Sequence, residues 1–260
     1  MFFDNIVLTV VIWSLIGIVG AYLAWFLVSW LILIIFCLTV PVKKQYERPS
    51  KFYKGLLNYG YWVICKMGRV SIKASGIENV PFDTKFLLVS NHRSKFDNMI
   101  HSLCLKNACL SFISKKENFN IPIGRHYINR MCYLPLDRGN IKSGIETINR
   151  AIYFLNNDIT SIGLFPEGTR SETLELLPFH DGCFKIATKT HCPIVVGVTQ
   201  GTEKIHKNWP FKRTKVTFDV VKVIYGEEYK DKKSVELSDM IRNLMLEKLN
   251  ENNLSEKIGE

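Results

Sequence analysis

The strongest constraint on the fold of this chain is a run from Asn5 to Val42 that contains no charged side chain. As one helix the run would be about 57 Å long, whereas the hydrocarbon core of a bilayer is about 30 Å thick. A single perpendicular span would therefore leave part of it unused. Two short spans in a helical hairpin would fit, as would one span that continues into an interfacial helix, and we favour the hairpin. The sequence thus predicts a hydrophobic membrane anchor over residues 1–42.

A cleaved secretory signal peptide is the alternative interpretation of this run. Signal peptides have a basic first segment and a small-residue cleavage site, whereas this start carries Asp4 and the apolar run is too long. Basic residues cluster just after the run, opposed by a single acid, Glu47. They are Lys43, Lys44, Arg48, Lys51 and Lys54. The positive-inside tendency therefore predicts that the main domain lies on the cytoplasmic face.

The charge of the chain indicates which partners to expect. Residues 43–260 carry all 34 basic residues and 23 of the 24 acidic ones, a net charge of +11, because Asp4 is the only charged residue before them. Such a charge favours anionic membrane lipids and phosphate-bearing ligands. Nucleic acid is the other common partner of a basic chain, but no nucleic-acid-binding motif is present and the apolar run argues against one. We expect no nucleic-acid partner.

The cysteines and histidines show no metal-binding or disulfide pattern. The seven cysteines are an odd number without Cys-x-x-Cys spacing, and most lie within apolar runs. This is typical of reduced, buried thiols. The six histidines also lack metal-ligand spacing. We expect neither a disulfide framework nor a metal site.

Residues 43–69 form a basic, amphipathic segment. Apolar residues recur at helical spacing between Phe52 and Met67, and lysines or arginines lie near both ends. A helix of this kind lies on the bilayer surface as an interfacial segment, or packs on the core of a domain. The pattern fits both equally.

From residue 70 onward, short apolar runs alternate with helical patterns. The runs predict strands at 70–74, 85–90, 108–113, 131–136, 159–165 and 193–198, and a half-exposed strand near the sheet edge at 216–220. The helical patterns predict helices at 97–104, around an apolar stripe at Ile145, Ile148, Ile152 and Leu155, and from Ser234, with a loose tail beyond Asn250. The alternation predicts an α/β domain over residues 70–260. Its largely parallel central sheet would be flanked by helices and preceded by the membrane-embedded helical segment.

Three chemically unusual loops follow predicted strands, where open α/β sheets build their sites. They are Asn91 to Asp97, Pro135 to Asn140, and Phe165 to Ser171. In the first loop, His92 and Asp97 are residue types suited to a general base and the carboxylate that orients it. Five residues along a continuous helix rotate about 500°, so the two side chains meet only if a turn separates them. The alternative is that His92 bonds to a loop carbonyl and Asp97 caps a helix, without a contact between them. If these two residues are considered without the rest of the sequence, this alternative is favoured.

The other two loops carry arginines suited to binding phosphate. Arg138 precedes Gly-Asn, and Arg170 follows Gly168, so both side chains would project from tight turns. On neighbouring strand ends, two arginines would clamp a phosphate through forked hydrogen bonds. Glu167 would repel a phosphate, so we expect it to position an arginine or to accept a hydrogen bond from a sugar or glycerol hydroxyl.

Together the loops resemble the glycerolipid acyltransferase family, whose best-known members acylate 1-acyl-glycerol 3-phosphate. The first family block, Asn-His-x-x-x-x-Asp, is matched by Asn91, His92 and Asp97, and the third, Phe-Pro-Glu-Gly-Thr-Arg-Ser, by Phe165 to Ser171. Lys115-Lys116-Glu117 and Arg138 look like the second block, and the resemblance covers about residues 70 to 200.

The resemblance implies that His92, oriented by Asp97, deprotonates the acceptor hydroxyl, whose oxygen then attacks an acyl thioester. It implies phosphate contacts from Arg138, Glu167, Gly168, Thr169 and Arg170. Lys115 is a candidate donor to the oxyanion. The acyl donor would be acyl-CoA or acyl-carrier protein, the acceptor a lysophospholipid, and no cofactor is implied.

Two kinds of alternative remain open at this point. Glycerol 3-phosphate, another lysophospholipid or an acylated amino acid would serve as acceptor in the same chemistry. A non-catalytic membrane lipid-binding protein, or a hydrolase in which water replaces the acceptor, would be a different class.

Overall fold

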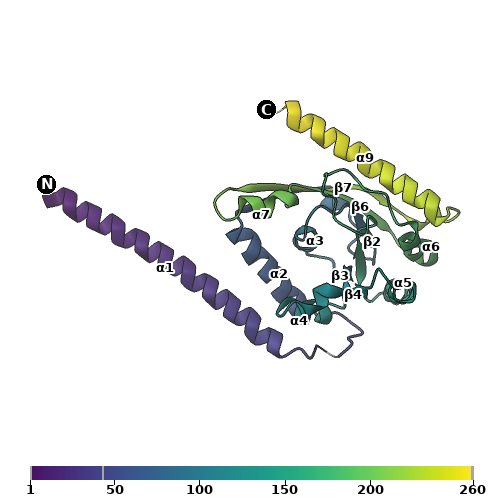
Figure 1. Cartoon of the computed structure of the whole chain (residues 1–260), viewed down its shortest axis with the longest axis horizontal. Coiled ribbons are helices and arrows are strands. Elements are labelled where there is room, and N and C mark those ends of the chain that lie inside the picture. Colours follow the sequence, from purple (N-terminus) through teal and green to yellow (C-terminus); the bar gives the residue numbers. More distant parts are fainter. Residues whose placement is uncertain (1, 43, 259–260) are drawn as a thin grey trace.

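The computed structural model of the chain describes residues 2–42 and 44–258, and its centre is a seven-stranded sheet (Figure 1). The strand order is β1-β7-β6-β2-β5-β3-β4. The strands are β1 (Val70–Ser75), β2 (Leu87–Ser90), β3 (Leu110–Lys115), β4 (Leu134–Leu136), β5 (Ser161–Leu164), β6 (Ile194–Gln200) and β7 (Thr214–Ile224). Every neighbouring pair is parallel except β6 and β7. The predicted α/β fold with a largely parallel sheet is confirmed.

Helices cover both faces of the sheet (Figure 1). The α-helices are α1 (Phe2–Leu38), α2 (Lys51–Met67), α3 (Asp97–Cys104), α4 (Gly124–Arg130), α5 (Ile141–Asn156), α6 (Lys185–Thr190), α7 (Ile205–Asn208), α8 (Gly226–Tyr229) and α9 (Ser234–Ile258). Short 3-10 helices are η1 (Ile77–Asn79), η2 (Lys116–Asn120), η3 (Asp181–Phe184) and η4 (Thr202–Lys204).

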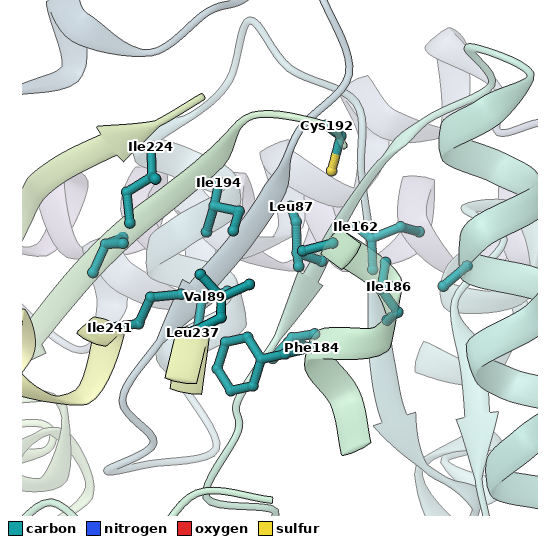
Figure 2. Packing of buried hydrophobic residues seen from close by; sticks show 14 of the residues in the cluster. Leu87, Val89, Ile162, Phe184, Ile186, Cys192, Ile194, Ile224, Leu237 and Ile241 are labelled. Atoms are coloured by element: carbon teal, nitrogen blue, oxygen red, sulfur yellow. The ribbon is translucent and has the colours of Figure 1, made fainter. Parts of the chain in front are cut away.

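Strand β2 shows why the sheet is covered on both sides. Its residues alternate between the two faces, and Leu87 and Leu88 are both fully buried, as expected of a central parallel strand. Leu87 lies in a core shared with α5, α6 and α9, in which Phe184 and Ile241 also pack (Figure 2). Leu88 lies in the opposite core, which α2, α3 and α4 cover. The loops at the carboxyl ends of the strands therefore extend from a sheet that is packed on both faces.

Helix α1 is a single continuous helix, so the favoured hairpin is wrong. A hairpin needs a turn, but Gly17 and Gly20 are isolated among apolar residues and the run offers no cluster of turn residues. Its segment Asn5–Leu38 is 34 residues long and contains an 18-residue stretch with a mean hydropathy of 2.5, so it is long and apolar enough to cross a membrane. The first part of α1 projects away from the sheet (Figure 1), and its large apolar side chains are exposed.

Helix α2 packs on the domain core, which was one of the two open alternatives for residues 43–69. Its side chains Leu57, Tyr61 and Cys65 are buried in the core beneath the sheet. It also runs antiparallel to α1, because the Ser29 hydroxyl bonds to Tyr59 at 2.7 Å while Trp25 packs edge-on against Trp62 at 5.8 Å. Phe52 and Trp62 lie on the exposed side of α2, outside the core.

Two further predictions about helices need correction. In α5, Leu155 of the predicted apolar stripe is buried and Ile148 and Ile152 pack against the core, as do Ala151 and Phe154, but Ile145 is 55% exposed. Helix α9 continues to Ile258 where a loose tail was expected beyond Asn250. Long-range contacts hold this end, because the Asn252 amide donates to Gln200 Oε1 at 2.7 Å and to Asp219 Oδ2 at 3.0 Å.

Candidate active site

The first predicted loop brings His92 and Asp97 together at the carboxyl end of β2. Asp97 begins α3, and His92 lies on the turn between the strand and the helix. His92 Nδ1 is 2.7 Å from Asp97 Oδ2. The side chain of His92 is 19% exposed and that of Asp97 is fully buried. The turn expected between the two residues is confirmed, and the imidazole keeps one edge toward the surface.

The Asp97 carboxylate is surrounded by hydrogen-bond donors. Its Oδ2 accepts the backbone N–H groups of Arg93 at 2.7 Å and Ser94 at 2.8 Å, and its Oδ1 accepts the Thr202 hydroxyl at 2.5 Å. A carboxylate of this kind acts as an acceptor only, so His92 Nδ1 carries a hydrogen and donates it to Asp97. Nε2 is then the nitrogen with the free lone pair.

The loop after β5 fixes His92 from the other side. Strands β2 and β5 are neighbours, so the two loops meet. The His92 N–H donates to Glu167 Oε1 at 2.6 Å, and the His92 carbonyl accepts the Ser171 N–H at 3.0 Å. The Phe165 ring stacks on the imidazole with centroids 4.2 Å apart and 16° between the planes. Both backbone polar groups and one ring face of His92 are thus held by this loop.

Glu167 is placed differently from the prediction that it contacts a phosphate. It is 3% exposed, and its Oε2 accepts the Leu177 N–H at 2.9 Å while Oε1 accepts from His92. Both oxygens therefore accept hydrogen bonds from the protein backbone, and the side chain is almost inaccessible to a phosphate or a hydroxyl. Glu167 positions the His92 loop.

Gly168 has the positive φ that its loop was expected to need. Its φ is 66°, and an added Cβ would lie 2.8 Å from Cδ2 of His180. The Gly168 N–H also closes the turn by donating to the Phe165 carbonyl at 3.0 Å. A side chain at this position would both strain the backbone and collide with His180.

The predicted phosphate and oxyanion residues lie on exposed loops. Arg138, Thr169 and Arg170 are exposed, and among the described residues neither arginine side chain makes a hydrogen bond or an ion pair. Lys115 ends β3 and pairs with Glu117 at 3.1 Å. The two arginines are not on neighbouring strands as predicted, because β3 separates β5 from β4. That spacing puts the two strand ends roughly 10 Å apart across the sheet.

A buried polar cluster behind the pair was missed by sequence reasoning. The Asn91 side chain bonds to both backbone groups of Thr199 on β6, at 2.9 and 2.7 Å. The Thr199 hydroxyl lies 2.8 Å from His101 Nε2, and burial lowers the pKa of His101 to about 4. His101 therefore stays neutral near pH 7 and acts as a packed hydrogen-bonding ring. Only the adjacency of β2 and β6 would have revealed these contacts.

Replacing Thr202 with valine should weaken the support of Asp97. The change removes the hydroxyl that bonds to Oδ1, and a hydrogen bond to a charged group contributes about 2 kcal/mol. We expect a loss of about 2 kcal/mol in the free energy of unfolding, measured by denaturant titration. Thr217→Val is the matched control, because the buried Thr217 hydroxyl has no partner in the described part of the chain. Equal effects of the two changes would contradict the assigned support.

Glu167 should make stability depend on pH. Burial raises the pKa of Glu167 above its ordinary value of 4.5, against the lowering effect of its two backbone hydrogen bonds. Because the pKa is higher in the folded chain, this group stabilises the fold most below about pH 4.5, and the contribution is lost as pH rises through the folded-state pKa. We expect the free energy of unfolding of the original chain, minus that of Glu167→Gln, to fall as the pH rises above about 4.5. A difference that grows with pH would contradict this.

No group of three or more histidine, cysteine, aspartate or glutamate side chains in the described residues is arranged to hold a metal ion.

Comparison with known proteins defines the class to which the site belongs. Residues 71–198 match the family model described as Acyltransferase. This segment contains the His92–Asp97 pair and the β5 loop that holds it. The domain built around this site therefore belongs to the acyltransferase family.

Individual relatives point to one branch of that family. A chloroplastic 1-acyl-sn-glycerol-3-phosphate acyltransferase of Brassica napus is 35% identical over 179 residues, which are 67% of this chain and 50% of the relative. One of Arabidopsis thaliana is 37% identical over 135 residues, 52% of this chain and 37% of the relative. This chain thus spans half or less of the length of these plant relatives.

A solved structure agrees with the sequence comparisons. The crystal structure of PlsC, the 1-acyl-sn-glycerophosphate acyltransferase of Thermotoga maritima, superposes with a TM-score of 0.60 at 25% identity. The similarity covers 78% of this chain and 84% of that chain. It therefore extends beyond the family-model segment.

Proposed function

We propose that the protein transfers a fatty acyl group from an acyl thioester to the free hydroxyl of 1-acyl-glycerol 3-phosphate, which yields phosphatidic acid. The observation that carries the proposal is the His92–Asp97 hydrogen bond of 2.7 Å, with Nδ1 as donor and Nε2 toward the surface, inside a domain of the acyltransferase family. The names of the relatives support the choice of acceptor.

The geometry suits direct attack by the acceptor. His92 Nε2 takes the proton of the hydroxyl while its oxygen bonds to the carbonyl carbon of the thioester. The tetrahedral intermediate collapses with cleavage of the carbon–sulfur bond, and the leaving thiolate receives the proton from His92. Asp97 holds the ring in the required tautomer and stabilises the imidazolium that forms between the two proton transfers. We assign the oxyanion contact to Lys115, which ends β3, the strand next to β5.

Arg170 is proposed to contact the acceptor phosphate from the β5 loop. Its side chain is exposed and, among the described residues, forms no ion pair, so its guanidinium is available to a ligand. Thr169 and the Gly168 backbone lie beside it. Arg138 would reach the same phosphate only across the end of β3, so its contribution should be the smaller one.

Replacing Arg170 with glutamine should raise the KM for 1-acyl-glycerol 3-phosphate about tenfold or more with little change in kcat. Loss of a charge-assisted hydrogen bond to phosphate weakens binding by this amount, and the base is untouched. Steady-state rates over a range of acceptor concentrations give both constants. Arg213→Gln is the matched control, because Arg213 lies before β7 and bonds to the Ser71 hydroxyl at 2.8 Å. An unchanged KM would remove Arg170 from the phosphate site.

We propose further that α1 anchors the protein to a membrane, with the acyltransferase domain on the cytoplasmic face. Support comes from the apolar length of Asn5–Leu38, whose side chains are mostly exposed, and from the basic residues that follow it. The basic surface suits contact with anionic lipids.

One assay tests the reaction as a whole. The purified full chain is given acyl-CoA or acyl-carrier-protein donors with 1-acyl-glycerol 3-phosphate, glycerol 3-phosphate or another lysophospholipid, and the products are separated. We expect phosphatidic acid from the first acceptor at the highest kcat/KM. Free fatty acid formed at the same rate without acceptor would indicate a hydrolase, and a higher kcat/KM for another acceptor would change the substrate assignment.

A further inference from the structure

A cleft opens at the edge of the sheet opposite to His92. Its volume is about 720 Å³. Lys85, Cys109 and Ser161 line it at the amino ends of β2, β3 and β5, and the first turns of α2 line its side. These three strands are parallel, and their carboxyl ends carry the candidate active site. The cleft and the active site are therefore separated by the full length of the strands.

The cleft is lined by many more cations than anions. Its basic side chains are Arg48, Lys51, Lys54, Lys85 and Lys106. Asp158 is the one carboxylate on the described lining, and it pairs with Lys85 at 3.1 Å. The other four basic side chains have no acidic partner among the described residues. A pocket of this kind concentrates positive potential in a concave space.

Among the four cations without an acidic partner in the described residues, Lys54 alone is not fully exposed. It is partly buried, and burial, reinforced by the charge of Lys51, lowers the pKa of the Lys54 amine against the opposite effect of Cys109. A bound anion would favour the charged form of the Lys54 amine and so counteract the effects of burial and of Lys51. The α2 amino terminus adds the positive end of the helix dipole, and Asn58 and Asn107 supply neutral donors.

We propose that this cleft is a binding site for a phosphate-bearing anion, separate from the acyltransfer site. Lysine ammonium groups bind phosphate as compact point charges, and several around one cavity suit a ligand with two or more negative charges. Phe82 and Ile159 add apolar contacts for the organic part of such a ligand.

The position of the cleft bears on the source of the phosphate. Helices α1 and α2 are antiparallel, so the first turn of α2, which lines the cleft, lies far from the exposed amino-terminal part of α1. A soluble phosphorylated compound and a lipid headgroup share the recognised chemistry, and the experiment has an arm for each.

The soluble arm measures pyrophosphate binding to the full chain in detergent by calorimetry. We expect saturable binding that the double variant Lys54→Gln/Lys106→Gln weakens about tenfold, since each lost charge contributes a few-fold. Lys73→Gln/Lys232→Gln removes the same charge from exposed positions outside the cleft and should leave the affinity unchanged. Arg170→Gln should also bind pyrophosphate at this site.

The lipid arm compares sedimentation of the same two double variants with phosphatidylcholine vesicles that contain or lack phosphatidic acid. A loss confined to Lys54→Gln/Lys106→Gln in this arm alone would support the site and assign it to a headgroup. Equal behaviour of the two double variants in both arms would overturn the proposal, as would loss of all pyrophosphate binding in Arg170→Gln. The single variant Lys106→Gln, on an exposed loop, replaces the double variant if thermal unfolding shows that the latter is not folded.

Discussion

Replacing His92 with alanine should lower kcat for acyl transfer by about 10²- to 10⁴-fold, the range that a positioned general base contributes. The buried Asp97 carboxylate holds Nδ1 of the ring, which leaves Nε2 with the free lone pair, and the side chain of His92 is partly exposed. The contacts that organise the loop are made mainly by the His92 backbone, so they persist in the variant. We therefore expect an almost unchanged KM for the acceptor.

The control for this experiment is His206→Ala, because His206 is an exposed histidine on α7. Rates are measured with saturating donor and acceptor, and folding is checked by thermal unfolding. Full activity of His92→Ala would eliminate the proposed mechanism. A parallel loss in His206→Ala would show that the assay responds to something other than the base.

Replacing Asp97 with asparagine should have a double effect. The amide presents N–H donors where the carboxylate accepts four hydrogen bonds, so either the His92 ring adopts the wrong tautomer or a buried donor loses its partner. We expect kcat to fall about 10³- to 10⁴-fold, as for a comparable change in a serine protease triad, and the free energy of unfolding to fall by about 3 kcal/mol.

Both effects are needed to identify the role of Asp97. Steady-state kinetics measures the first, and denaturant titration of the same preparation measures the second. Asp231→Asn, at an exposed position between α8 and α9, should change neither. A stable Asp97→Asn variant with nearly full activity would show that the orientation of His92 does not depend on the carboxylate.

The sequence predicted the sheet because its strands are short, apolar and separated by helical patterns. The predicted and observed β6 begin within one residue of each other, and the helix that begins at Asp97 has the predicted bounds. The predicted hairpin in residues 1–42 was wrong because length and hydropathy do not indicate where a chain turns. The prediction that Ile145 is buried was wrong because packing against the sheet decides which face of a helix is buried. In α5 that face is centred on Ala151 and Phe154.

In the candidate site, too, contacts between residues close in sequence could be predicted and contacts between distant residues could not. His92 and Asp97 are five residues apart, so local geometry was sufficient to require a turn if the two side chains meet, and the structure shows that they do. Glu167 lies 75 residues from His92, and its sequence neighbours made it look like part of a phosphate loop. Thr202 lies 105 residues from Asp97 and carries no motif at all.

The sequence by itself determined the α/β class, the apolar segment, and the short motif that carries His92 and Asp97, because each depends on periodicity or on residues a few positions apart. Only the tertiary structure decided that Glu167 and Thr202 support this pair, that β3 separates the two arginine loops, and that four cations without an acidic partner in the described part of the chain line the cleft at the opposite edge of the sheet. These depend on which strands lie side by side, and strand order is set by packing over the whole chain.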